Sequence, residues 1–249
     1  MQSPRPRHRS RWRVARAVTL IAALVPMVAS TTACGDADGA DAADGAEATT
    51  SEVGKVTVAG DSISVGVGAA LRAELGEERE VRVIGEGGTG LARMDSFDWP
   101  TRLEALARDF PPDVVVFSVG SNDAQDLVDA DGRLVAPLSD DAAWDREYTN
   151  RLARSFDAFE GTDTTVVWLG HVRSAEDRVG TRNRHVHRLA EQVAAERDWV
   201  EVRDLAQMLG SDEDVATDCL IPDGLHLSTE CLDRAAASLS SSPPINSGT

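Results

Sequence analysis

Three residues of this chain carry the side chains of an activated serine nucleophile. Ser62 stands in the string Gly60-Asp61-Ser62, while Asp223 and His226 lie three positions apart near the other end of the chain. A serine hydroxyl becomes a good nucleophile when an imidazole takes its proton and a carboxylate orients that imidazole. The pattern predicts Ser62 as nucleophile, His226 as base and Asp223 as its partner.

The sequence around Ser62 predicts a turn between a strand and a helix. Residues 55–59 are a short apolar run, and Val67, Leu71 and Leu75 then recur at helical spacing. Ser62 would therefore lie at a helix N-terminus, where free backbone N–H groups and the helix dipole favour negative charge.

Strands and helices alternate through the rest of the chain, which predicts an α/β fold. Short Val-rich runs, apolar on both faces, are typical of buried parallel strands. They occupy residues 55–59, 81–84, 113–119, 164–169 and 199–202. We expect a five-stranded parallel sheet with helices on both faces and, because aromatic residues make up only 4% of the chain, an aliphatic core. In open sheets of this type, ligands bind at the carboxyl ends of the strands.

Four separated blocks resemble the SGNH hydrolase (GDSL-type esterase/lipase) family. The blocks are Gly60-Asp61-Ser62-Ile63-Ser64, Thr89-Gly90-Leu91, Gly120-Ser121-Asn122-Asp123 and Asp223-Gly224-Leu225-His226-Leu227-Ser228. The resemblance spans most of residues 55–240 and implies a single flavodoxin-like three-layer α/β/α domain that hydrolyses acyl esters of lipids or carbohydrates. It implies Ser62, Asp223 and His226 as catalytic residues. It also implies an oxyanion hole made of the backbone N–H groups of Ser62 and Gly90 and the side-chain amide of Asn122.

Gly90 has no Cβ that would hinder the approach of its backbone to a substrate. Two positions depart from the family pattern, because Gly85 stands where an asparagine is usual and Cys231 where a glycine is expected.

The blocks leave alternatives open. The same triad could transfer an acyl group to a glycan hydroxyl, or the chain could be a surface binding protein that no longer turns over. Residues 85–90 fit the dinucleotide pattern G-x-G-x-x-G, but an irregular stretch follows where a long helix is required. His171 could contact substrate or fill a capping or core role, and we expect His185 and His187 at the surface. No cofactor and no metal are expected.

The sequence pattern of residues 1–33 predicts an export signal. Arginines precede an apolar stretch, and small residues then lead to Cys34, which resembles a lipoprotein processing site where the cysteine is acylated. Ordinary signal cleavage near Ala33 and an uncleaved anchor are the alternatives. Residues 34–53 are acidic and almost free of large apolar side chains, as in a disordered linker. We expect the hydrolase domain over 54–240 and a disordered tail over 241–249.

Cys219 and Cys231 bracket Asp223 and His226. In an oxidising compartment we expect them to form a disulfide that holds the base loop, the alternative being two buried thiols. A net charge of −17 argues against binding to nucleic acid or to anionic lipid headgroups. The expected partner is a small-molecule or glycan acyl ester, with membrane contact through the lipid anchor alone. The expected state is an extracytoplasmic monomer, lipid-anchored or secreted.

Overall fold

The computed structural model describes residues 54–171, 177–210 and 217–247. The export signal predicted for residues 1–33, Cys34 and the linker predicted for residues 34–53 lie outside these ranges. Within them, no helix has the length and apolar character needed to cross a membrane.

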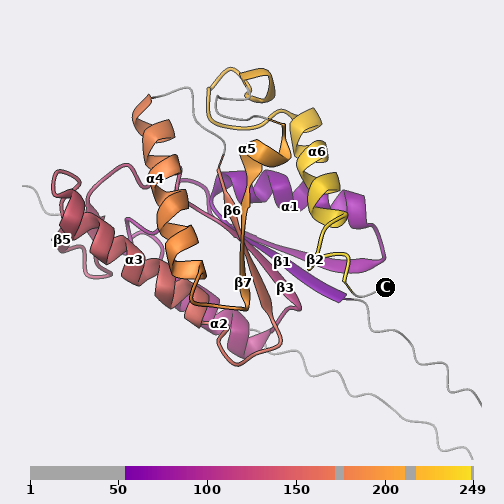
Figure 1. Cartoon of the computed structure of the whole chain (residues 1–249), viewed down its shortest axis with the longest axis horizontal. Helices are drawn as coiled ribbons and strands as arrows, with labels where there is room; N and C mark the ends of the chain where they lie inside the picture. Colours follow the sequence, from indigo (N-terminus) through magenta and orange to yellow (C-terminus); the bar gives the residue numbers. More distant parts are fainter. Residues whose placement is uncertain (1–53, 172–176, 211–216, 248–249) are drawn as a thin grey trace, which may run out of the picture. The chain divides into compact units, whose positions relative to one another are not determined.

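A five-stranded parallel sheet lies at the centre, in the strand order β2-β1-β3-β6-β7 (Figure 1). Its strands are β1 (Gly54–Gly60), β2 (Arg79–Gly85), β3 (Val114–Ser118), β6 (Thr165–Gly170) and β7 (Val200–Asp204). All five predicted strands are found, and each prediction ends within about two residues of the observed bounds, as expected for boundary estimates. The middle strand β3 is buried along its whole length, which explains its continuous apolar run.

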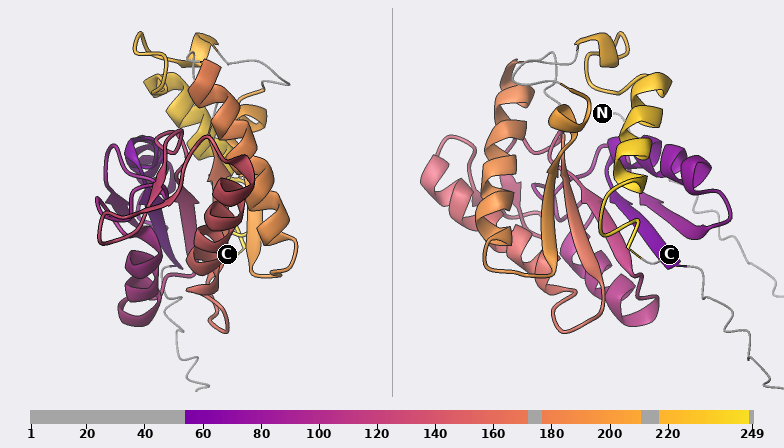
Figure 2. Two further views of the ribbon diagram at one scale, coloured as in Figure 1. Left: turned by 90° about the vertical axis from the view of Figure 1, so that its left-hand side faces the viewer. Right: turned by 45° about the vertical axis from the view of Figure 1, so that its right-hand side comes forward.

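Helices cover both faces of the sheet and complete the predicted three layers (Figure 2). One face carries α1 (Ser62–Leu75), α5 (Leu205–Met208) and α6 (Thr229–Ser240). The other carries α2 (Trp99–Asp109), α3 (Asp141–Asp157) and α4 (Asp177–Ala194). The helices begin where a short polar side chain accepts a hydrogen bond from a first-turn N–H, as at Asp61, Asp98, Asp140, Asp204 and Ser228.

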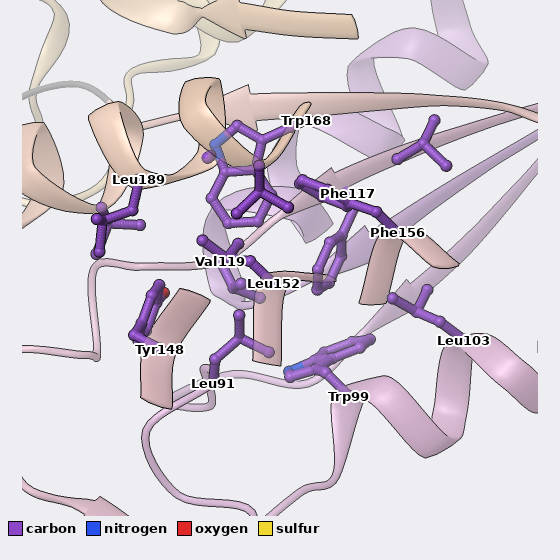
Figure 3. Packing of buried hydrophobic residues seen from close by; sticks show 14 of the residues in the cluster. Leu91, Trp99, Leu103, Phe117, Val119, Tyr148, Leu152, Phe156, Trp168 and Leu189 are labelled. Carbon is purple, nitrogen blue, oxygen red and sulfur yellow. The ribbon is translucent and has the colours of Figure 1, made fainter. Parts of the chain in front are cut away.

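The two faces of the sheet have different cores. Beneath α1 and α6 the core is aliphatic, as predicted. Beneath α2, α3 and α4 it is aromatic: Phe117 and Phe156 both pack near edge-on against Trp168, with ring centroids 5.5 and 5.9 Å apart (Figure 3). The expectation of a wholly aliphatic core is wrong because the few aromatic residues are concentrated on this one face.

Three further features differ from the predictions. A small antiparallel hairpin, β4 (Leu127–Val128) and β5 (Leu134–Ala136), was not foreseen, and neither was the short 3₁₀ helix η1 (Thr217–Cys219). Residues 241–247 are not a disordered tail, because Ile245 is 1% exposed in the core beside α6 and Arg203 donates a 2.8 Å hydrogen bond to the Pro243 carbonyl.

Candidate active site

Ser62, His226 and Asp223 form one hydrogen-bonded chain. His226 Nε2 lies 2.8 Å from Ser62 Oγ, and His226 Nδ1 lies 2.7 Å from Asp223 Oδ2. Ser62 is the first residue of α1, directly after the turn that leaves β1. The imidazole therefore bridges a hydroxyl and a carboxylate, which is the arrangement that lets it accept the hydroxyl proton.

Asp223 organises the loop that carries the imidazole. Its Oδ1 accepts hydrogen bonds from the backbone N–H groups of Leu225 at 2.9 Å and His226 at 3.0 Å. The backbone N–H groups of His226 and Leu225, followed by the His226 side chain, lower the pKa of Asp223 to about 2. The carboxylate is thus ionised at neutral pH and can stabilise a positively charged imidazole.

The Cys219–Cys231 disulfide closes this loop, which confirms the predicted bridge and excludes two free thiols. It joins η1 to the first turn of α6. Within the loop, the N–H of Ser228 donates to the Cys219 carbonyl at 2.7 Å and that of Ile221 to the His226 carbonyl at 2.9 Å. The base and its carboxylate are held on a short, covalently closed segment.

Asp61 joins the nucleophile to the loop after β3. It is fully buried, and its Oδ1 accepts the N–H of Ile63 at 3.0 Å, capping α1. Its Oδ2 accepts the Ser121 hydroxyl at 2.8 Å and lies 3.4 Å from the Asn122 side-chain nitrogen. One carboxylate therefore positions both Ser62 and the segment that contains Asn122.

Asn122 and the second block lie together, as the sequence predicted. The Asn122 amide donates to the Thr89 carbonyl at 2.8 Å, and its second contact is the long one to Asp61. No backbone hydrogen bond from Gly90 is found in the part of the chain that the structure describes. An incoming oxyanion could use the Gly90 N–H and the Asn122 N–H now in the long contact.

Asp123 is a functional candidate that sequence reasoning missed. It is fully buried and accepts the N–H groups of Leu91 at 3.1 Å and Ala92 at 2.8 Å, as well as the Tyr148 hydroxyl at 2.7 Å. Burial raises the pKa of Asp123 and raises that of Tyr148 well above its usual value. A Cβ at Gly90 would overlap the Asp123 carboxylate, so the glycine makes room for Asp123 rather than for a substrate.

Two further side chains hold the same segment. Arg151 is buried and donates to the carbonyls of Leu91 at 2.7 Å and Ala92 at 3.0 Å. The indole N–H of Trp99 donates to the Thr89 hydroxyl at 3.0 Å. Trp99 is therefore a buried residue that holds Thr89 in place, and it does not line an open pocket. Its burial could be predicted from its helical spacing, whereas the role of Arg151 had no local signal.

The His171 side chain is buried. Its side chain is 1% exposed, and its Nδ1 accepts the N–H of Ser121 at 3.2 Å. Its Nε2 is buried, has no hydrogen-bond partner among the residues that the structure describes, and lies 3.7 Å from Asp61 Oδ2. The burial of this side chain behind Asp61 supports the capping or core alternative over the substrate contact.

The glycine-rich segment 85–90 lacks the setting of a dinucleotide site. It follows β2, but the next helix begins only at Trp99. Without a helix N-terminus directly after the glycines there is no cradle for a pyrophosphate. Among the residues that the structure places, no group of three His, Cys, Asp or Glu side chains is arranged to hold a metal ion.

Residues 55–225 match the family model described as Protein of unknown function (DUF459). The chain belongs to the DUF459 family. No curated protein sequence matches it.

Solved structures show which fold this DUF459 chain adopts. A protein from Slackia heliotrinireducens assigned to the SGNH hydrolases is 18% identical, with a TM-score of 0.54 over 76% of this chain and 98% of that one. An acetylxylan esterase from Geobacillus stearothermophilus is 17% identical, with a TM-score of 0.52 over 76% and 94%. The catalytic domain of peptidoglycan O-acetyltransferase A from Streptococcus pneumoniae is 11% identical, with a TM-score of 0.52 over 76% and 90%. The predicted resemblance is confirmed: the chain has the SGNH hydrolase fold.

Proposed function

We propose that this DUF459 protein is a serine esterase that cleaves acyl esters of lipids or carbohydrates through an acyl-Ser62 intermediate. The observation that carries the proposal is the chain from Ser62 Oγ through His226 to Asp223, with contacts of 2.8 and 2.7 Å. Two segments far apart in the sequence, the turn with Ser62 and the loop with Asp223 and His226, meet there at the carboxyl edge of the sheet, where ligands of such folds bind.

In the first half-reaction the Ser62 oxygen attacks the acyl carbonyl carbon while His226 Nε2 takes the hydroxyl proton. A tetrahedral oxyanion forms, and its collapse breaks the bond to the alcohol oxygen, which receives that proton from His226. The ionised Asp223 stabilises the imidazolium between these two transfers. The alcohol departs and the acyl group remains on Ser62.

The oxyanion is stabilised by the backbone N–H groups of Ser62 and Gly90 and by the Asn122 amide. The Asn122 N–H facing Asp61 at 3.4 Å is the weaker of its two contacts, so it is the one transferred to the substrate. Removing one such donor costs about 3 kcal/mol of transition-state stabilisation.

In the second half-reaction water attacks the acyl carbonyl and His226 takes a proton from it. The second tetrahedral intermediate expels Ser62, which recovers its proton from His226, and the acid is released. The chain's own groups supply every proton transfer, so the cycle needs no cofactor.

The test is hydrolysis of p-nitrophenyl acetate by wild type, Ser62→Ala and the control Ser96→Ala, an exposed serine. Ser62→Ala is expected to lose turnover by about a thousandfold or more with an unchanged melting temperature, while Ser96→Ala keeps both. Wild-type turnover in Ser62→Ala would contradict the proposal.

Transfer of an acyl group to a glycan is the second candidate, supported by the similarity of the fold to the peptidoglycan O-acetyltransferase domain. The triad is the same, and only the nucleophile that accepts the acyl group differs. Product analysis with and without an oligosaccharide acceptor separates the two. Acylated sugar in place of free acid would establish the transferase. A protein that neither hydrolyses nor transfers would be the non-catalytic binding protein.

We further propose that residues 1–33 are an export signal, that Cys34 is acylated and that residues 34–53 tether the domain outside the cytoplasm as a monomer. The Cys219–Cys231 disulfide is compatible with an oxidising compartment. Labelling with a palmitate analogue is expected in wild type and absent in Cys34→Ser. Release of unlabelled wild-type protein into the medium would establish ordinary secretion instead.

A further inference from the structure

A cleft of about 620 Å³ opens between the first two turns of α3 and residues 181–188 of α4. This is the size of a site for a small organic ligand. Most of the residues that line it are charged or polar, although their carbon atoms, with Ala124 and Leu138, form the larger part of the exposed lining. The side chains that matter here are Leu138, Asp141, Asp145, Arg182, His185 and Arg188.

A hydrogen-bonded chain of three side chains joins α3 to α4 in the cleft. His185 Nε2 lies 2.6 Å from Asp145 Oδ1, and Arg188 Nη2 lies 3.1 Å from His185 Nδ1. Since a guanidinium can only donate, His185 Nδ1 accepts and its Nε2–H donates to Asp145. His185, expected at the surface, is thus only partly exposed and is linked to both helices that form the cleft.

Arg182, on α4 like His185 and Arg188, lies with its guanidinium over the ring of buried Trp144 of α3, 4.2 Å from its centroid. Within the described ranges no carboxylate lies close enough to form an ion pair with Arg182. A stacked guanidinium keeps its N–H groups available in its own plane. Arg182 is therefore a fixed donor beside the acceptors Asp141 and Asp145.

The cleft is connected to the proposed oxyanion hole. The Trp144 indole donates to the Gln125 carbonyl at 2.9 Å, and the Gln125 side-chain amide donates to the Asn122 carbonyl. Ala124, two residues after Asn122, lines the cleft itself. A ligand in the cleft would lie against the same loop that presents Asn122.

We infer that this cleft binds the sugar portion of a carbohydrate ester, which narrows the substrate class of the proposed esterase and rests on that function. A sugar hydroxyl donates and accepts at once, so it can pair with the guanidinium and carboxylate groups that line this cleft together. Leu138 and Ala124 offer apolar surface to sugar C–H groups. A long acyl tail would instead desolvate these charges without pairing them. A polyanion could pair with Arg182 and Arg188 but would be repelled by Asp141 and Asp145, so the mixed charges favour a neutral sugar.

Binding energy from sugar units in the cleft would be used at Ser62, away from the contacts that supply it. The first experiment compares kcat/KM on an O-acetylated xylooligosaccharide with kcat/KM on p-nitrophenyl acetate. The variants are Arg182→Gln, Asp141→Asn and the double variant, with Arg102→Gln on exposed α2 surface as matched control. The ratio is expected to fall about tenfold in the double variant and to stay unchanged in Arg102→Gln. An unchanged ratio in all variants would overturn the inference.

The second experiment measures binding without turnover. It therefore tests sugar binding in the cleft even if the proposed esterase activity is wrong. Ser62→Ala is titrated with unacetylated xylohexaose, chitohexaose and hexagalacturonate by calorimetry and NMR. The inference is supported if a neutral hexasaccharide binds and shifts the NMR signals of residues 138–145 and 181–188. Adding Asp141→Asn should then weaken this binding about tenfold. Binding of hexagalacturonate alone, or of none of the three, overturns it. Asp141 is exposed, so its substitution leaves the fold intact.

Discussion

The Asp61 carboxylate accepts a 2.8 Å hydrogen bond from the Ser121 hydroxyl. Asp61 directly precedes Ser62, and Ser121 directly precedes Asn122. This one contact therefore sets the distance between the nucleophile and the proposed oxyanion amide. His171 supports it from behind, because its Nδ1 accepts the Ser121 N–H at 3.2 Å.

Asp61→Asn is expected to lower kcat by about tenfold to a hundredfold while leaving KM nearly unchanged. Asparagine can still cap α1 through its oxygen, but its NH₂ group would face the amide nitrogen of Asn122, where a carboxylate oxygen now lies. Steady-state kinetics on p-nitrophenyl acetate measures the change. Asp61→Ala is the matched variant that also loses the cap, at about 1 kcal/mol of stability. A wild-type kcat in Asp61→Asn would show that Asp61 has no positioning role.

Gly90→Ala is expected to destabilise the protein by about 1–3 kcal/mol, because the new methyl group would overlap the buried Asp123 carboxylate. Gly87→Ala in the same loop is the control, since its Cβ would meet only the Cβ of Ser62, at an ordinary 3.8 Å. Chemical denaturation of both variants measures the difference. Equal stability of the two would mean that Asp123 moves aside without cost.

The sheet could be predicted from sequence because each strand is a Val-rich run that is buried on both sides. The β4–β5 hairpin could not, because Leu134 and Val135 are exposed and the strands are only two and three residues long. Phe110 fitted the helical face of Leu103 and Leu106, yet it is 64% exposed, because α2 ends at Asp109.

The triad could be predicted because its residues sit in short, recognisable blocks. The buried residues that hold the neighbouring segments in place could not be predicted in this way. Asp123 and Arg151 act through contacts between segments far apart in the chain, and nothing in their local sequence indicates burial. Tyr148 lies at helical spacing with Trp144 and Leu152, which indicates its burial but not its hydrogen bond to Asp123. His171 follows a strand at the correct edge, but only the folded chain shows that it turns toward Asp61.

Replacing both Cys219 and Cys231 by alanine is expected to lower the free energy of unfolding by about 3 kcal/mol through the freed loop. kcat/KM should also fall, because the disulfide closes the segment that carries Asp223 and His226. Cys34→Ser, the third cysteine of the chain, serves as control. If the double variant retained wild-type stability and rate, the bridge would have no part in holding the base.

The pKa of Asp223 is lowered from 3.8 to about 2, so the sign of its pH effect is fixed. A lowered pKa stabilises the folded state above the unfolded value of 3.8, and this contribution is lost as the pH falls toward 2. At neutral pH we expect wild type to melt at a slightly higher temperature than Asp223→Asn. The difference should be small because the carboxylate is exposed to solvent. It should shrink as the pH falls from 3.8 toward 2. An advantage that grows as the pH falls would contradict this assignment.

The most direct measurement of the central claim is covalent labelling by a fluorophosphonate, followed by intact mass and peptide mapping. The Ser62–His226 contact of 2.8 Å predicts a single adduct on Ser62. Labelling should slow by about a hundredfold or more in His226→Ala, because an unassisted serine hydroxyl is a weak nucleophile. An adduct on another serine, or His226→Ala labelled at the wild-type rate, would contradict the account.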